Sequence, residues 1–109
     1  VNERTLPFLK KLRELQADTP ILMVASPNVW LNADRNALWK KIFQQAVDSG
    51  LTQLYFLDGD DLYGPTDNPT VDGVHPTDLG FYYMAIGYEA TLRQLLDIKS
   101  DAGSNAKNL

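Results

Sequence analysis

Cysteine is absent from the sequence, which excludes disulfides, thiolate chemistry and zinc-thiolate sites and leaves the redox compartment undetermined. Positive charge is also scarce. Ten Lys and Arg stand against fourteen Asp and Glu, for a net charge of -4, so no basic footprint argues for nucleic acid. The one basic cluster, Lys10, Lys11 and Arg13, is followed by Glu14 and predicts a solvated helix face. No apolar run approaches the roughly 20 residues that a membrane span needs.

The 109 residues suffice for one small domain and are too few for two. A hydrophobic fraction of 44% is typical of a globular protein. Apolar periodicity, prolines and turn residues predict the order helix, strand, helix, strand, loop, helix. The predicted ranges are 4–16, 21–25, 34–49 and 54–57, then a polar loop over 58–76 and a last helix from 77 or 78 to about 96. The polar tail, residues 100–109, is expected to fray.

The first predicted strand is a continuous apolar run, Ile21 to Ala25, as in strands that are buried on both faces of a parallel sheet. A strand, a helix and a second strand at this spacing form a right-handed βαβ crossover. The predicted fold class is therefore α/β, with two adjacent parallel strands and about three helices on both faces. The last helix is apolar nearly all round, so we expect it to pack against more than one layer, with Tyr82, Tyr83 and Tyr88 in the core.

Two segments leave the carboxyl ends of the predicted strands, where ligands bind in open α/β sheets. One runs from Ser26 to Trp30, and the other is the loop that carries Asp72 and the single histidine, His75. In a tight turn, residues i and i+3 share a side, so the Asp72 carboxylate can reach the histidine Nδ1–H and leave Nε2 free to take a proton. The alternative is an exposed histidine that only caps a turn. Trp30 either lines a substrate cleft or merely covers the end of the sheet.

Other candidate motifs have simpler interpretations. The run Asp58-Gly-Asp60-Asp61 resembles a Mg²⁺ or Ca²⁺ site, but its spacing fails for an EF-hand, and a solvated acidic turn is the preferred interpretation. Ser26 follows a strand but precedes a proline and has no glycine elbow, so it matches no acyl-transfer signature and is expected only to end the strand. No metal and no cofactor are implied by these motifs.

The stretch "TVDGVHPTDLGFYYMA", residues 70–85, resembles the final sequence block of the SGNH hydrolases, also called GDSL esterases: Asp-x-x-His, a proline and a glycine-containing helix. Residues 4–27 and 54–64 are similar to the segments that precede this block in bacterial members. The resemblance covers the chain to about Leu96 and implies a flavodoxin-like three-layer α/β/α sandwich. It also implies that Asp72 is the acid and His75 the base of a Ser-His-Asp triad.

The family's nucleophile and oxyanion blocks have no counterpart here, because Gly-Asp-Ser occurs nowhere in the sequence. We therefore interpret residues 1–99 as the C-terminal part of an SGNH domain, inactive alone, whose parent hydrolyses carboxylic esters such as acetyl esters on carbohydrate. The alternative is a non-catalytic module. In either case, we expect self-association or a chain that supplies the missing half. The resemblance is compatible with a secreted or periplasmic protein, and the compartment stays undetermined.

Overall fold

The computed structural model describes residues 2–60, 62–66 and 68–100. These residues form three helices and two strands, in the predicted order along the chain. The elements are α1 (Asn2–Leu15), β1 (Ile21–Val24), α2 (Ala33–Asp48), β2 (Leu54–Leu57) and α3 (Asp78–Ser100). Within the described part of the chain, no helix is both long enough and apolar enough to cross a membrane.

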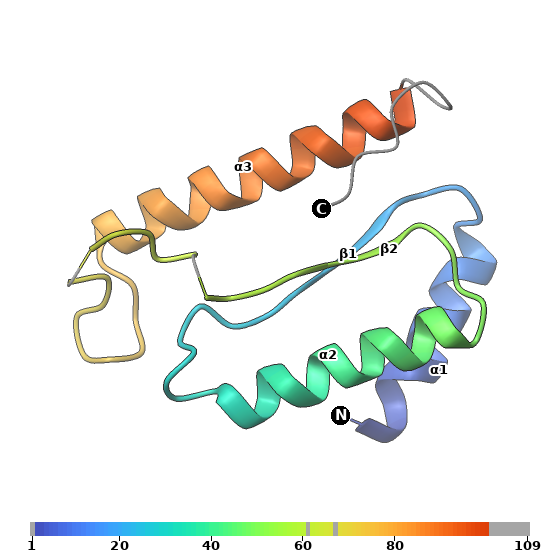
Figure 1. Ribbon diagram of the computed structural model, residues 1–109, viewed down its shortest axis with the longest axis horizontal. Coiled ribbons are helices and arrows are strands. Elements are labelled where there is room, and N and C mark those ends of the chain that lie inside the picture. The colour runs from blue at the N-terminus through green and yellow to red at the C-terminus, as the bar shows by residue number, and fades with distance from the viewer. Residues whose placement is uncertain (1, 61, 67, 101–109) are drawn as a thin grey trace.

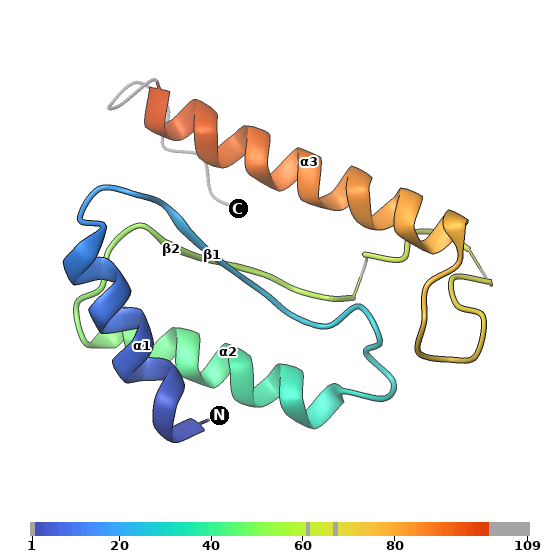
Figure 2. The same cartoon turned by 180° about the vertical axis from the view of Figure 1, so that it is seen from behind.

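The two strands are parallel and pair in register from Ile21 with Leu54 to Val24 with Leu57. Helices α1 and α2 lie on one side of this sheet and α3 lies on the other, as Figures 1 and 2 show from opposite sides. The predicted fold class, a partial α/β/α sandwich with two parallel strands, is confirmed.

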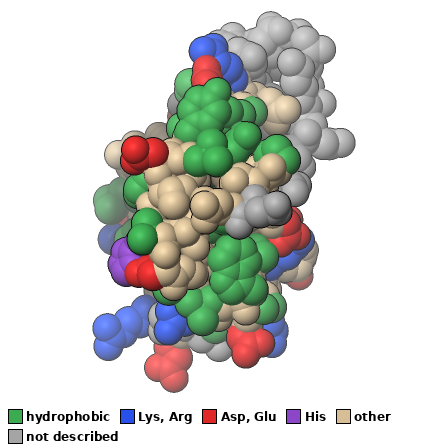
Figure 3. Space-filling model, turned by 90° about the vertical axis from the view of Figure 1, so that its left-hand side faces the viewer, with side chains coloured by type: hydrophobic (Ala, Val, Ile, Leu, Met, Phe, Trp, Pro, Cys, Tyr) green, Lys and Arg blue, Asp and Glu red, His purple; other side chains and the backbone are tan. Residues whose placement is uncertain are grey.

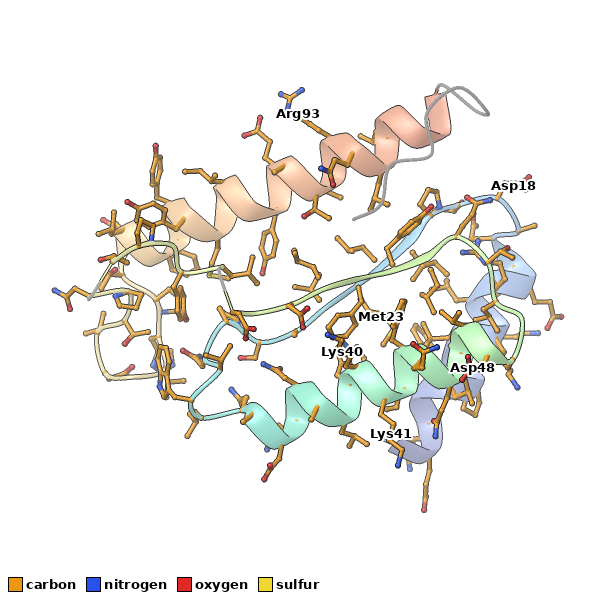
Figure 4. The ribbon with its side chains drawn as sticks, viewed as in Figure 1. Asp18, Met23, Lys40, Lys41, Asp48 and Arg93 are labelled. Atoms are coloured by element: carbon orange, nitrogen blue, oxygen red, sulfur yellow. The ribbon has the colours of Figure 1, made fainter. Side chains whose placement is uncertain are left out.

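The main core lies between the sheet and the two helices α1 and α2. Figure 4 shows Met23 pointing from β1 toward α2. Its neighbours in the buried cluster come from all the elements on this side: Leu9, Ile42, Ala46 and Leu54. Burying a large apolar side chain contributes about 1.5–3 kcal/mol, so this cluster is the main support for the βα layer that carries the loops of the site.

Arg13 fastens the end of α1 to the start of the sheet. Its guanidinium donates hydrogen bonds to the carbonyls of Gln16 (2.7 Å), Thr19 (2.6 Å) and Gln53 (3.2 Å). Arg13 is half-buried and makes these contacts in addition to belonging to the basic face that the sequence predicts. The last carbonyls of a helix have no hydrogen-bond donor within the helix, and the planar guanidinium of arginine can donate to several of them at once.

Helix α3 is less buried than its sequence predicts. Tyr83 and Tyr88 are half-buried, but the Tyr82 side chain is 60% exposed, so the prediction that it belongs to the core is wrong. Other large apolar side chains of α3 are exposed too: Leu79, Phe81, Ile86, Leu92 and Leu96. A two-stranded sheet is too narrow to cover a helix that is apolar nearly all round. Helix α3 continues to Ser100, and the rest of the predicted tail, residues 101–109, lies outside the described residues.

Candidate active site

Both strands run toward the same end of the molecule, and the two loops that follow them meet there (Figure 1). This is the carboxyl edge at which the sequence places Asp72, His75 and Trp30. The two loops leave from the same edge because β1 and β2 are parallel, which places both carboxyl ends of the strands there. The residues of the candidate site therefore come from the segment after β1 and from the loop between β2 and α3.

Asp72 and His75 are in direct contact. The Oδ2 atom of Asp72 lies 2.6 Å from Nδ1 of His75. The other carboxylate oxygen, Oδ1, accepts hydrogen bonds from the backbone N–H groups of Val74 (2.9 Å) and His75 (2.8 Å). This is an Asx-type turn, in which an aspartate bonds the backbone a few residues ahead. The contact that the i, i+3 spacing predicts is present.

The surrounding backbone closes the loop around this pair. Gly73 has a φ of 88°, which only glycine adopts without strain, and its N–H donates to Oγ1 of Thr70 (3.0 Å). The Val71 N–H donates to the His75 carbonyl (2.8 Å). Thr77 then caps α3 by accepting the Gly80 N–H at Oγ1 (3.1 Å). The turn is therefore anchored to the start of α3.

Hydrogen bonding keeps the carboxylate ionised. The backbone N–H of His75, the His75 ring and the Val74 N–H hold the pKa of Asp72 well below its usual range. Because an ionised carboxylate can only accept, Nδ1 of a neutral His75 must carry the proton, and Nε2 is then unprotonated. The His75 side chain is 77% exposed, and the histidine lies at the surface of this end of the molecule (Figure 3).

Two buried residues that the sequence did not single out join the two loops. The Asn28 amide donates from Nδ2 to the carbonyl of Val74 (3.1 Å), and the Tyr63 hydroxyl donates to Oδ1 of Asn28 (3.1 Å). Asn28 belongs to the segment that was expected to reach this edge, but no spacing or motif connects it with Val74. An asparagine in the segment that follows the predicted strand was the only signal in the sequence.

Trp30 and Ser26 also lie in the segment after β1. The Trp30 side chain is 59% exposed, and its ring packs on Tyr63 with centroids 6.1 Å apart. Ser26 has structural contacts: its Oγ accepts from the Asn28 N–H (3.2 Å) and from Nδ2 of Asn32 (3.0 Å). The expectation that Ser26 ends the strand fits these bonds, because they occupy its hydroxyl oxygen within its own loop.

A pocket of about 530 Å³ opens at the end of β1. Its lining comes from β1, the loop after it and α2: Val24, Ala25, Ser26, Arg35, Asn36, Leu38 and Trp39. Asp72 and His75 are exposed and lie outside this lining. The polar side chains in this lining include Ser26 and Asn36, which hydrogen-bond within the loop after β1 and its contact with α2.

Acidic side chains do not gather into a metal site in the described part of the chain, where no three of Asp, Glu or His come together. Asp58 instead pairs with Nζ of Lys40 (3.3 Å), and both side chains are largely exposed. Asp61 lies outside the described residues. The arrangement around Asp58 fits the solvated acidic turn.

Comparison with known proteins confirms the family resemblance. Residues 1–93 match the GDSL-like lipase/acylhydrolase family. The fold is similar to the crystal structure of a candidate GDSL-like lipase from Bacteroides ovatus, with a TM-score of 0.62 and 27% sequence identity over 88% of this chain. The chain spans about a third (32%) of that protein's length. No curated protein shows a significant match. The chain belongs to the GDSL-like lipase/acylhydrolase family.

Proposed function

We propose that Asp72 and His75 are the acid and base of a Ser-His-Asp triad that hydrolyses carboxylic esters. The observation that carries the proposal is the 2.6 Å contact between Oδ2 of Asp72 and Nδ1 of His75. It leaves Nε2 as a proton acceptor on an exposed ring at the sheet edge where α/β folds bind ligands. Family membership supports the reaction class.

The serine comes from a segment outside these 109 residues, since the sequence contains no Gly-Asp-Ser. Its Oγ attacks the ester carbonyl carbon while Nε2 of His75 takes the hydroxyl proton. His75 then gives this proton to the leaving alkoxide, and an acyl-enzyme remains. His75 next takes a proton from water, the hydroxide attacks the acyl carbon, and the proton returns to serine. Asp72 keeps the imidazole in one tautomer and stabilises the imidazolium.

Trp30 forms one wall of the substrate site in this proposal. Its exposed ring is held by packing on buried Tyr63, and Tyr63 bonds Asn28, which in turn bonds the loop of His75. A flat, rigid aromatic surface suits the apolar face of a sugar ring or an acyl chain. An acetyl ester on a carbohydrate therefore fits the site as a substrate.

The test uses the full-length protein that contains this chain. His75→Ala should lower kcat for an aryl acetate by several orders of magnitude, because triad members act as a unit. Thr66→Ala, in the same loop, is the control and should stay near wild type. The 109-residue chain alone should show negligible turnover. An enzyme that retains full activity as His75→Ala would contradict the proposed triad, and robust turnover by the chain alone would redirect attention to Ser26.

A further inference from the structure

Asn28 makes the side-chain contact between the segment after β1 and the Asp72–His75 turn. It is 7% exposed, and its amide lies between the Val74 carbonyl and the Tyr63 hydroxyl, each at 3.1 Å. Tyr63 is itself 5% exposed. The bond from Tyr63 to Asn28 is buried and the bond from Asn28 to Val74 is partly buried, so the loss of either partner would leave a polar group poorly hydrated.

Hydrogen-bond chemistry fixes which end of the Asn28 amide faces the turn. A backbone carbonyl can only accept, so the NH₂ end of Asn28 must face Val74. The oxygen end then faces Tyr63, whose hydroxyl must donate. On its other side, the Asn28 backbone N–H donates to Oγ of Ser26 at the end of β1 (3.2 Å). Asn28 is thus bonded both to the segment directly after β1 and to the turn.

Val74 is one of the two residues between Asp72 and His75, directly before the histidine. Its N–H donates to Oδ1 of Asp72 and its carbonyl accepts from Asn28, so both of its backbone polar groups are held. The bonds between Asp72 and His75 are local and set only the geometry of the pair. The position of the Asp72–His75 pair relative to β1 depends on contacts from outside the loop, and Asn28 provides one of them.

We propose that Asn28, oriented by Tyr63, is a positioning residue that holds the Asp72–His75 turn in place against the end of β1. The inference rests on the proposed function, because placement matters for turnover only if His75 is the catalytic base. A histidine that is displaced by about 1 Å from its serine can lose on the order of a hundredfold in rate.

The first experiment measures backbone ¹⁵N order parameters of Val74 and His75 in the full-length protein that contains this chain. In the unmodified chain both should be near the rigid value of about 0.85, and in Asn28→Ala they should fall toward about 0.6. Asn36→Ala is the matched control, because the Asn36 amide also makes two hydrogen bonds, but both go to the Ser26 backbone (2.9 Å each). The control should leave the turn rigid.

The second experiment measures kinetics in the full-length protein. Asn28→Ala should lower kcat about tenfold to a hundredfold with little change in KM, while Asn36→Ala keeps both. Tyr63→Phe removes only the hydroxyl, and Asn28→Asp keeps the acceptor for Tyr63 but loses the donor to Val74. These two variants replace Asn28→Ala in the test if that variant does not fold. Asn28→Asp should lose more activity than Tyr63→Phe, because only Asn28→Asp loses the bond to Val74 directly.

Loss of order together with loss of kcat supports the proposal. A turn that stays rigid in Asn28→Ala overturns it, and so does an unchanged kcat in an enzyme that His75→Ala inactivates. Equal mobility in Asn28→Ala and Asn36→Ala also overturns it, because the effect is then not specific to the contact with Val74. An enzyme indifferent to His75→Ala would instead overturn the proposed function, and the order parameters would still decide whether Asn28 holds the turn.

Discussion

Gly59 lies directly against the backbone carbonyl of Ser26, so close that a Cβ atom at position 59 would overlap with the carbonyl oxygen. Gly59 follows β2 and Ser26 follows β1, and this contact brings the two loops of the candidate site together where the strands end. The obstacle is backbone rather than a flexible side chain, so it cannot move aside without displacing β1.

Replacing Gly59 should therefore destabilise the fold. We expect Gly59→Ala to lower the free energy of unfolding by about 1–3 kcal/mol, as overpacking of a close contact does. Gly87→Ala is the control. A Cβ there meets only the tip of the Leu62 side chain, and alanine favours a helix by about 1 kcal/mol. Chemical denaturation followed by circular dichroism compares the two. Equal stability of the two variants would contradict the close approach.

Asp72 should make the stability of the turn depend on pH. Its folded pKa is lowered relative to the unfolded value of about 3.9. The stabilisation is therefore fully present above about pH 4 and is lost as pH falls below that value toward the folded pKa. Asp72→Asn cannot ionise, so its stability should vary less between about pH 2 and 5. Denaturation curves across this range, with Asp34→Asn as control, test the expectation. Parallel curves for Asp72→Asn and the unmodified chain would contradict it.

Asp72→Asn should also reveal the role of the carboxylate in the full-length protein. An amide in this position can donate to Nδ1 and favour the other tautomer of His75, which puts the proton on Nε2. A comparable change in a serine protease triad lowers kcat about ten-thousandfold. We expect a large loss in kcat near neutral pH, with the fold intact by circular dichroism. A variant with normal kcat would show that the carboxylate does not orient the base.

Trp30→Ala should weaken substrate binding with little effect on the fold. The side chain is 59% exposed and packs mainly on Tyr63, so its removal takes away little buried area. Losing one aromatic contact corresponds to a rise in KM of a few-fold to about tenfold. Phe8→Ala, which removes a ring that is 62% exposed on α1, should leave KM unchanged. An unchanged KM of Trp30→Ala toward both aryl and carbohydrate acetates would show that Trp30 is not part of the substrate site.

The 109-residue chain should self-associate. In the described residues β1 pairs with β2 alone, which leaves its other edge as a template for a strand. Helix α3 also exposes Tyr82 and Ile86. Sedimentation at several concentrations should show dimers or larger species, and Ile86→Lys should shift them toward monomer. Lys41→Glu changes an exposed side chain of α2 and should not shift them. A folded monomer at micromolar concentration, with residues 21–24 protected from hydrogen exchange, would contradict this prediction.

The sequence by itself determined the elements and the catalytic candidates, because both depend on neighbours in the chain. Proline and apolar spacing predicted α1, and a continuous apolar run predicted a parallel strand. That strand, β1, is only half-buried except at Met23, so its predicted burial on both faces is not met. The Asp72–His75 contact was predictable because the two residues are three positions apart in a turn that contains a glycine. The family block around them also lies within one short stretch.

Only the tertiary structure decided how this turn is held and which surfaces are covered. Asn28 and Val74 are 46 positions apart, and no periodicity links them. The Arg13 guanidinium donates a hydrogen bond to the carbonyl of Gln53, 40 positions away, which the charge pattern of its helix did not predict. Tyr82 is exposed although its helix is apolar. Helical spacing shows that a face is apolar, but the width of the neighbouring sheet decides whether that face is buried.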